Sequence, residues 1–465
     1  MTIQRNVDMC NGRLLPNILK YSLPLMLTGL LQLLYNAADI IVVAKWAGGT
    51  ALAAVGSNSA LINLIVNLFI GLSVGASVAV SQFYGAEDRQ NVHRAVHTAM
   101  AVSGISGIAT MLIGLLIARP ALEWMDTPVE VIDQSTLYLR IYFLGMPAAM
   151  IYNFGAAILR AVGDTKRPLY ILTAAGLINV GLNLILVIVF HLDVAGVAIA
   201  TTVSQIFSAV MVVLCLIHSY DSYRLELRKL RIYKDKLLLM LRHGIPAGIQ
   251  SSIFSASNII IQSSVNSFGA AAVAGSAAAG NLEGFVYTSM NAFQHTCLAF
   301  TGQNIGAKRP ERLRRIVWLC LLCVTVTGIA MSTILLLFGN EMLSLYTATS
   351  TVENAVSPAE ILAFGMRRLW YICPGYFLCG IMDVLVGSLR GMGTSVTPMA
   401  VSILGVCGVR IVWVYTVFAL INRTFETLFL SYPVSWLITL LATAVCLLII
   451  QHRVIRRLRA EIANE

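Results

Sequence analysis

Charged residues are scarce in this sequence. Only 12% of the 465 residues are Asp, Glu, Lys or Arg, whereas 58% are hydrophobic and the mean hydropathy is +0.79. A soluble core cannot bury that much apolar surface, so the composition excludes a soluble globular protein and indicates a membrane protein. Basic loops on one side of a membrane then explain the formal net charge of +10, and no nucleic-acid partner is expected.

Motifs typical of several other protein classes are absent. The sequence has no Gly-rich phosphate loop that ends in Lys and Ser or Thr, so we expect no ATP site and no enzyme. Cys320 and Cys323 have no second Cys pair or nearby His, so no zinc site and no other cofactor is expected. The apolar stretch after Lys20 is too long for a cleavable signal, and we expect it to remain as the first span.

Long apolar runs alternate with short polar connections along the whole chain. About twelve runs reach the ~20 residues that a helix needs to cross a bilayer, so we predict an all-α polytopic membrane protein. The runs extend over residues 18–43, 52–80, 98–118, 136–158, 168–190, 194–218, 245–268, 272–300, 316–339, 361–388, 398–420 and 428–450.

Basic residues gather in every second connection between these runs. Arg94, Lys166 and Lys229 are examples from the even-numbered connections, whereas the odd-numbered connections hold mainly acids such as Glu130 and Asp193. Positively charged loops remain on the cytoplasmic side during insertion. We therefore expect a multi-pass protein of the cell (inner) membrane with both termini in the cytoplasm.

The second half of the chain repeats motifs of the first half in the same order. Gln-x-x-Gly-Ala occurs at 82–86 and again at 303–307, and Leu-Arg followed by Gly and Pro occurs at 159–168 and at 389–398. Such an ordered series of matches indicates a duplication. Each half contains an even number of runs, so the two six-helix repeats are expected to be parallel.

The duplication also predicts the domain organisation. We expect an N-lobe over residues 1–218 with spans one to six, a basic cytoplasmic linker over 219–236, and a C-lobe over 237–465 with spans seven to twelve. Two parallel repeats of this kind are typical of secondary transporters.

At these motifs the chain resembles the multidrug and toxic compound extrusion (MATE) family of bacterial efflux transporters. The residues that carry the resemblance are PLMLTGLLQLLYNAAD at 24–39, SQFYGA at 81–86, LRAVGDTKRP at 159–168, GVAIAT at 196–201, GQNIGA at 302–307 and LRGMGTS at 389–395. The resemblance implies antiport: efflux of small amphipathic or cationic compounds by alternating access of two lobes, coupled to inward proton or sodium movement. The alternative is a flippase for lipid-linked or other amphipathic molecules of the same superfamily. We expect a monomer in the lipid bilayer.

Polar residues inside the apolar runs of the first half suggest an ion-coupling site. A carboxylate at bilayer depth is costly, so Asp39 in the first run is expected to have a function, together with Asn36 on the same helical face. Asn179 and Asn183 lie one turn apart in the fifth run, and Thr201 lies in the sixth. One carboxylate with several neutral oxygens suits a proton or a sodium ion, and no other metal is expected. Hydrogen bonding between helices is the alternative role of the asparagines. The resemblance adds that proton-coupled relatives often have Asp at the position of Asn183.

The second half has a different set of polar residues. Glu283, Asp383 and Arg410 are its deepest ionisable residues, and we expect Arg410 to pair with one of the two acids because an unpaired buried charge is costly. The other acid would be free to attract a cationic substrate or to carry a proton. A polar stripe in the seventh run indicates either a wet cavity or a tight helix interface. The residues predicted for a substrate cavity are Gln32, Tyr35, Asn153, Gln250, Asn258, Gln262, Glu283, Asp383 and Arg410.

Overall fold

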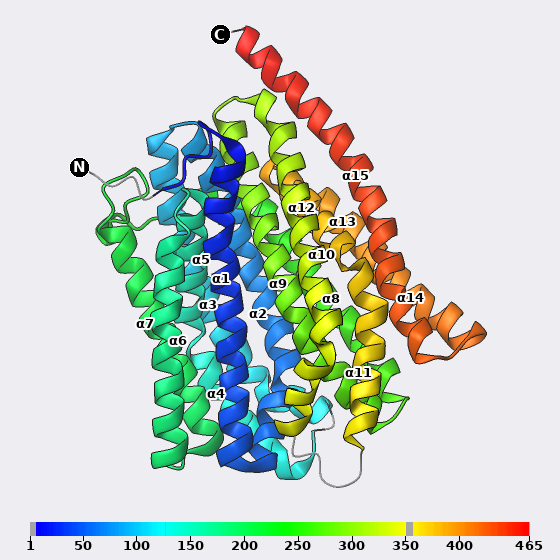
Figure 1. The fold of residues 1–465 in the computed structure, drawn as a ribbon. Coiled ribbons are helices and arrows are strands. Elements are labelled where there is room, and N and C mark those ends of the chain that lie inside the picture. Colours follow the sequence, from blue (N-terminus) through cyan, green and yellow to red (C-terminus); the bar gives the residue numbers. More distant parts are fainter. Residues whose placement is uncertain (1–5, 126, 350–356, 465) are drawn as a thin grey trace. The chain divides into compact units, whose positions relative to one another are not determined.

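The computed structural model describes residues 6–125, 127–349 and 357–464, and every regular element in these ranges is a helix (Figure 1). Four elements are π-helical, η1, η2, η5 and η6, and η3 and η4 are short 3₁₀ helices. The elements are α1 (Leu14–Val42), η1 (Val43–Ala47), α2 (Gly48–Gly85), α3 (Arg89–Trp124), α4 (Val129–Leu144), α5 (Met146–Ala161), α6 (Lys166–Asn183), η2 (Leu184–Val189), α7 (Asp193–Ile217), η3 (Leu227–Lys229), α8 (Lys234–Asn266), α9 (Ala270–Gly306), α10 (Pro310–Thr349), α11 (Pro358–Ile372), η4 (Cys373–Gly375), α12 (Tyr376–Gly391), α13 (Val396–Ser402), η5 (Ile403–Gly408), α14 (Val409–Trp413), η6 (Val414–Ile421) and α15 (Phe425–Ala463).

The predicted all-α membrane fold is confirmed. Within the described residues, 9 helices are long and apolar enough to cross a membrane, and the pair α4 and α5, bent by 47°, makes up to 10. The two remaining predicted spans correspond to α8, with 33 residues, and α9, with 37 residues. Both are long enough for a bilayer, but polar and small side chains lower their hydropathy.

The chain divides into two compact units. Unit 1 contains Met1–Asp8 and Leu27–Ser252, and unit 2 contains Met9–Met26 and Ile253–Glu465. Two of the three boundaries between the units fall inside long helices, after Met26 in α1 and after Ser252 in α8, and the third lies between Asp8 and Met9, before α1 begins. The lobe limits predicted from the sequence, with a linker over residues 219–236, stay a prediction.

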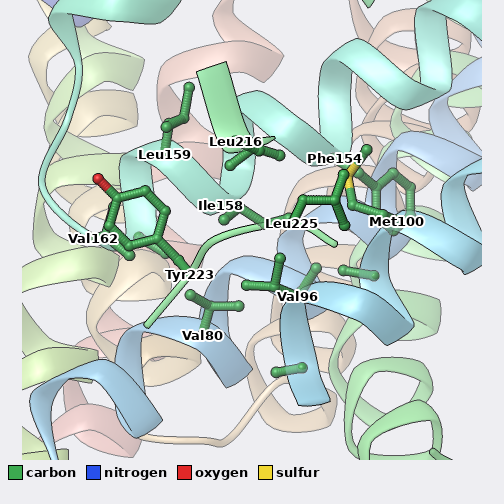
Figure 2. Packing of buried hydrophobic residues seen from close by; sticks show 14 of the residues in the cluster. Val80, Val96, Met100, Phe154, Ile158, Leu159, Val162, Leu216, Tyr223 and Leu225 are labelled. Atoms are coloured by element: carbon green, nitrogen blue, oxygen red, sulfur yellow. The ribbon is translucent and has the colours of Figure 1, made fainter. Parts of the chain in front are cut away.

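The core of unit 1 includes the segment that follows α7. Tyr223 and Leu225 are buried against Val80 of α2 and Val96 of α3 (Figure 2). Next to them, the ring nitrogen Nε2 of His97 lies 3.1 Å from the backbone nitrogen of Glu226. The basic segment between the two repeats is thus held to the ends of α2 and α3 by apolar packing and by backbone hydrogen bonds.

Small residues allow α2 and α8 to approach each other within unit 1. A Cβ atom built on Gly71 would overlap the backbone of Gly248, and one built on Gly75 would overlap the carbonyl oxygen of Met240. Close backbone approach at small residues is a common way for membrane helices to pack, because lipid provides no hydrophobic driving force between them. The first half of α8 is fixed to unit 1 by this contact.

The repeat is also visible in how two helices end. α5 ends before Gly163 and α12 ends before Gly393, and both glycines have positive φ angles, +96° and +80°. Residues with side chains rarely adopt this conformation, so glycine is the residue expected at these positions. The same helix ending therefore recurs at the corresponding place in each repeat.

Candidate functional site

Four of the predicted ion-coupling residues lie together in unit 1. Asp39 is on α1, Asn179 and Asn183 are on α6, and Thr201 is on α7. The amide nitrogen of Asn183 donates to the carboxylate of Asp39 and lies 3.4 Å from the amide oxygen of Asn179. Asn179 donates in turn to the hydroxyl of Thr201 over 3.4 Å, and Thr201 donates to the carbonyl of Val197 over 3.0 Å. A single chain of hydrogen bonds thus connects three helices.

One oxygen of this cluster has no hydrogen-bond donor. The side-chain oxygen Oδ1 of Asn183 is buried and has no partner among the described residues, and Asn183 itself is fully buried. A buried acceptor without a donor is costly unless a cation or a proton reaches it. The described residues also provide no cation within 4 Å of Asp39. An anionic carboxylate and an amide oxygen without a donor are oxygen ligands that suit a sodium ion, and the carboxylate can instead take up a proton.

The backbone changes its geometry beside the cluster. Asn183 is the last residue of α6 before the π-helical η2, and α1 continues into the π-helical η1 four residues after Asp39. Short π-helical segments within α-helices are frequent at functional sites. Apolar side chains such as Val43, Val187 and Val197 pack as one buried cluster next to these breaks. The polar groups are therefore bordered by closely packed apolar side chains.

Tyr35 connects α1 to α6 one turn before Asp39. Its hydroxyl donates to the carbonyl oxygen of Thr173 over 3.2 Å, and its ring lies against Gly176. A Cβ atom on Gly176 would overlap this ring. Asn36 on the same helix is exposed and lies outside the chain of hydrogen bonds. The position of α1 relative to α6 therefore depends on the small size of residue 176.

This contact gives a testable prediction. Gly176→Ala should displace the Tyr35 ring, cost about 1–3 kcal/mol of stability through overpacking, and lower transport by moving Asp39 away from Asn183. Gly181→Ala on the same helix is the matched control, because no atom lies within 4 Å of a Cβ at that position. Melting temperature and dye efflux should both fall in the first variant only. Equal behaviour of the two variants would contradict the role of this contact.

The charges of unit 2 are arranged differently from the sequence prediction. Arg368 of α11 forms two parallel hydrogen bonds of 2.8 Å with the carboxylate oxygens of Glu283 on α9. It also donates to Ser276 over 2.6 Å, and its guanidinium lies 4.9 Å from the ring centre of Phe429. The predicted pairing of Arg410 with Glu283 is therefore wrong, because Glu283 is bound by Arg368 instead.

Asp383 and Arg410 are not joined either. Asp383, buried in α12, has Asn291 and Arg390 as polar neighbours. Arg410 donates from Nε to the hydroxyl of Ser435 over 3.0 Å and makes no ion pair within 4 Å in the described part of the chain. Both alternatives predicted for the partner of Arg410 thus fail.

The other residues predicted to line a cavity differ in exposure. Gln32, Asn258 and Gln262 are exposed, whereas Gln250 is buried. Gln262 donates to the next residue of its polar stripe, Asn266, over 3.2 Å. Asn153 is half-buried and donates to the carbonyl oxygen of Ala149 within its own helix over 2.8 Å. Their role in substrate binding stays a prediction.

Sequence reasoning missed Arg368 as the partner of Glu283. The neighbouring Arg367 is 57% exposed and lies 3.6 Å from Glu426, whereas the side chain of Arg368 is only 13% exposed. Adjacent residues on a helix point about 100° apart, so one of two consecutive arginines can face the core. Two consecutive arginines in an apolar run therefore indicate that one of them is buried. They do not indicate which acid on a distant helix is its partner.

Comparisons with known proteins agree with the fold. The family model described as MatE matches residues 24–185 and 246–416. The probable multidrug resistance protein YoeA of Bacillus subtilis is 27% identical over 428 residues, which cover 90% of each chain. Among solved structures, a MATE in complex with MaL6 has a TM-score of 0.89 at 22% identity and covers 98% of this chain and 100% of its own. The outward-facing structure of a multidrug resistance MATE family transporter has a TM-score of 0.88 at 21% identity, with 99% and 100% covered.

Proposed function

Because the chain belongs to the MatE family of membrane transporters, we propose that it exports small amphipathic or cationic compounds by alternating access, coupled to inward movement of protons or sodium ions. The relative from Bacillus subtilis is named for multidrug resistance, and a relative from Staphylococcus aureus is named a multidrug export protein. No cofactor takes part in this mechanism, and the transporter acts as a monomer. The cluster of Asp39, Asn179, Asn183 and Thr201 is the single observation that carries the coupling part of the proposal.

The charge of Asp39 explains how two cations can be exchanged. An anionic Asp39 attracts either the coupling ion or a cationic substrate, and the arrival of one reduces the attraction for the other. A ligand shifts a conformational equilibrium only through different affinities for the two states. Asp39 gives the two conformations different affinities for a cation on each side of the membrane, provided that its access alternates between the two sides. Exchange of unlike cations across the membrane is the expected outcome.

Efflux of ethidium from energised cells tests the proposal. Cells of a pump-deficient bacterium that express the protein should extrude the dye, and dissipating the gradient of the coupling ion should stop extrusion. A protonophore and a sodium ionophore, added separately, identify which ion is used. Extrusion that continues after both gradients have collapsed would contradict ion coupling. The flippase alternative instead expects a fluorescent lipid, and no dye, to move between leaflets.

We propose that residues 1–218 form the N-lobe, residues 219–236 the linker and residues 237–465 the C-lobe. Both termini and the linker are proposed to lie in the cytoplasm. Cysteine labelling tests this orientation in a variant without native cysteines. An impermeant maleimide should label Glu130→Cys in intact cells, and it should label Lys229→Cys only after permeabilisation. Both positions are exposed, so burial does not explain a difference. Labelling of position 229 alone in intact cells would invert the topology.

A further inference from the structure

Arg410 is a buried arginine without a carboxylate partner among the described residues. Its residue exposure is 5%, and its one side-chain hydrogen bond in the described part of the chain is the 3.0 Å bond from Nε to Ser435. The two buried acids of unit 2 already have polar partners, because Glu283 binds Arg368 and Asp383 lies beside Arg390. A buried guanidinium that lacks an anion pays a desolvation cost with little compensation. Among the described residues, the interior of unit 2 therefore contains one positive charge that no carboxylate neutralises.

Aromatic rings hold the guanidinium in a fixed orientation. Its central carbon lies 3.9 Å from the ring centre of Tyr432 and 5.7 Å from that of Trp436, both on α15. The two rings pack edge to face on each other at 5.7 Å, and Trp436 packs in the same way on Tyr376. Stacking on the face of a guanidinium leaves the hydrogen atoms at its edge available. Two parallel bonds to a planar carboxylate are the interaction that this edge makes best.

The internal repeat gives an independent reason to regard Arg410 as functional. In this part of the chain, a residue of the first repeat corresponds to the residue 230 positions later in the second repeat. Pro168 then corresponds to Pro398, and Leu184, where η2 begins, corresponds to Val414, where η6 begins. Arg410 lies on α14, between the π-helical segments η5 and η6. Applied to Asn179 and Asn183, the shift of 230 residues leads to the ends of α14. Arg410 therefore occupies the part of the C-terminal repeat that corresponds to the Asp39 cluster of the N-terminal repeat, but with the opposite charge.

We propose that Arg410 binds the carboxylate of aromatic zwitterionic substrates, with the half-buried ring of Tyr432 beside the aromatic body. This inference rests on the proposed export function and specifies its substrate class. A compound that has both a cationic group and a carboxylate satisfies the buried positive charge of unit 2, whereas a purely cationic compound meets repulsion there. The transporter then prefers flat zwitterions over their esterified, cationic analogues.

Two dyes that differ only in this group test the proposal. Rhodamine 110 has a free carboxylate, and rhodamine 123 is its methyl ester with the same ring system. Binding to purified protein in detergent, followed by fluorescence polarisation, should be at least about tenfold tighter for rhodamine 110, as expected for a charge-assisted hydrogen-bonded pair. Arg410→Gln should reduce this ratio to about one, mainly by weakening rhodamine 110. An equal or reversed preference in the wild type, or an unchanged ratio in Arg410→Gln, would overturn the proposal.

Two further variants keep the result interpretable. Arg410→Lys retains the charge but loses the planar fork, so the ratio should fall several-fold even if Arg410→Gln does not fold. An unchanged ratio in Arg410→Lys would also count against the proposal. Arg367→Gln removes an exposed arginine of the same lobe and should keep the wild-type ratio. Binding is measured without an ion gradient, so it does not depend on export. If the protein exports no dye but still binds rhodamine 110 more tightly than rhodamine 123, the proposed export is rejected and the carboxylate site is not.

Discussion

Asp39→Asn is expected to reduce gradient-driven dye efflux to the rate of cells that lack the protein. The amide has nearly the shape of the carboxylate and can still hydrogen-bond to Asn183, so the amount of folded protein should stay unchanged. It cannot take up a proton, and it attracts a cation far less strongly than a carboxylate does. Efflux of ethidium and protein abundance in the membrane are the two measurements. Normal efflux by this variant would remove Asp39 from the mechanism.

Control variants separate the charge of Asp39 from its packing. Thr28→Ala alters a polar residue of α1 about three turns before Asp39, which the coupling mechanism does not use, and should retain efflux. Asp39→Glu retains the charge on a longer side chain and should preserve part of the activity. If Asp39→Glu and Asp39→Asn are equally inactive with normal folding, geometry rather than charge limits transport at this position.

The second large effect is expected on stability in unit 2. Arg368→Met leaves Glu283 as an uncompensated buried charge and should cost about 3–5 kcal/mol of unfolding free energy. The double variant Arg368→Met with Glu283→Met removes both charges and should recover most of this loss. Arg368→Lys should not restore the wild-type stability, because an ammonium does not form the two parallel bonds of 2.8 Å.

The adjacent arginine is the control for this series. Arg367 is 57% exposed and lies 3.6 Å from Glu426, so Arg367→Met should change the unfolding free energy by at most about 1 kcal/mol. Melting in detergent at fixed lipid content measures all four proteins. If the double variant is less stable than Arg368→Met, the pair does not account for the stability of this region.

The sequence was sufficient to predict the architecture. Apolar length alone locates most spans, because each must satisfy its backbone hydrogen bonds within a helix. The spans that correspond to α8 and α9 were also predicted from their apolar length, as the runs 245–268 and 272–300. The polar cluster was predicted because a carboxylate and two asparagines one turn apart are conspicuous in apolar helices. The hydrogen bond from Asn179 to Thr201 follows from helix packing in unit 1.

Contacts between distant helices were harder to predict. Glu283 and Arg368 are separated by 85 residues, and no local periodicity identifies them as partners. The surroundings of Arg410 could not be predicted either, because the rings of Tyr432 and Trp436, and not an acid, lie beside its guanidinium. The π-helical breaks also lack a signal in hydropathy. The repeat shift relates Leu184 to Val414, so one π-helical segment indicates the place of the other, but it predicts neither from the sequence alone.

Transport in proteoliposomes with imposed gradients is the most direct test of coupling at Asp39. Purified wild-type protein should move ethidium against its gradient when a proton or sodium gradient of the correct direction is applied. Asp39→Asn should fail to do so, yet it should still exchange labelled for unlabelled dye across the membrane at equilibrium. Concentrative uptake by Asp39→Asn equal to that of the wild type would contradict the account.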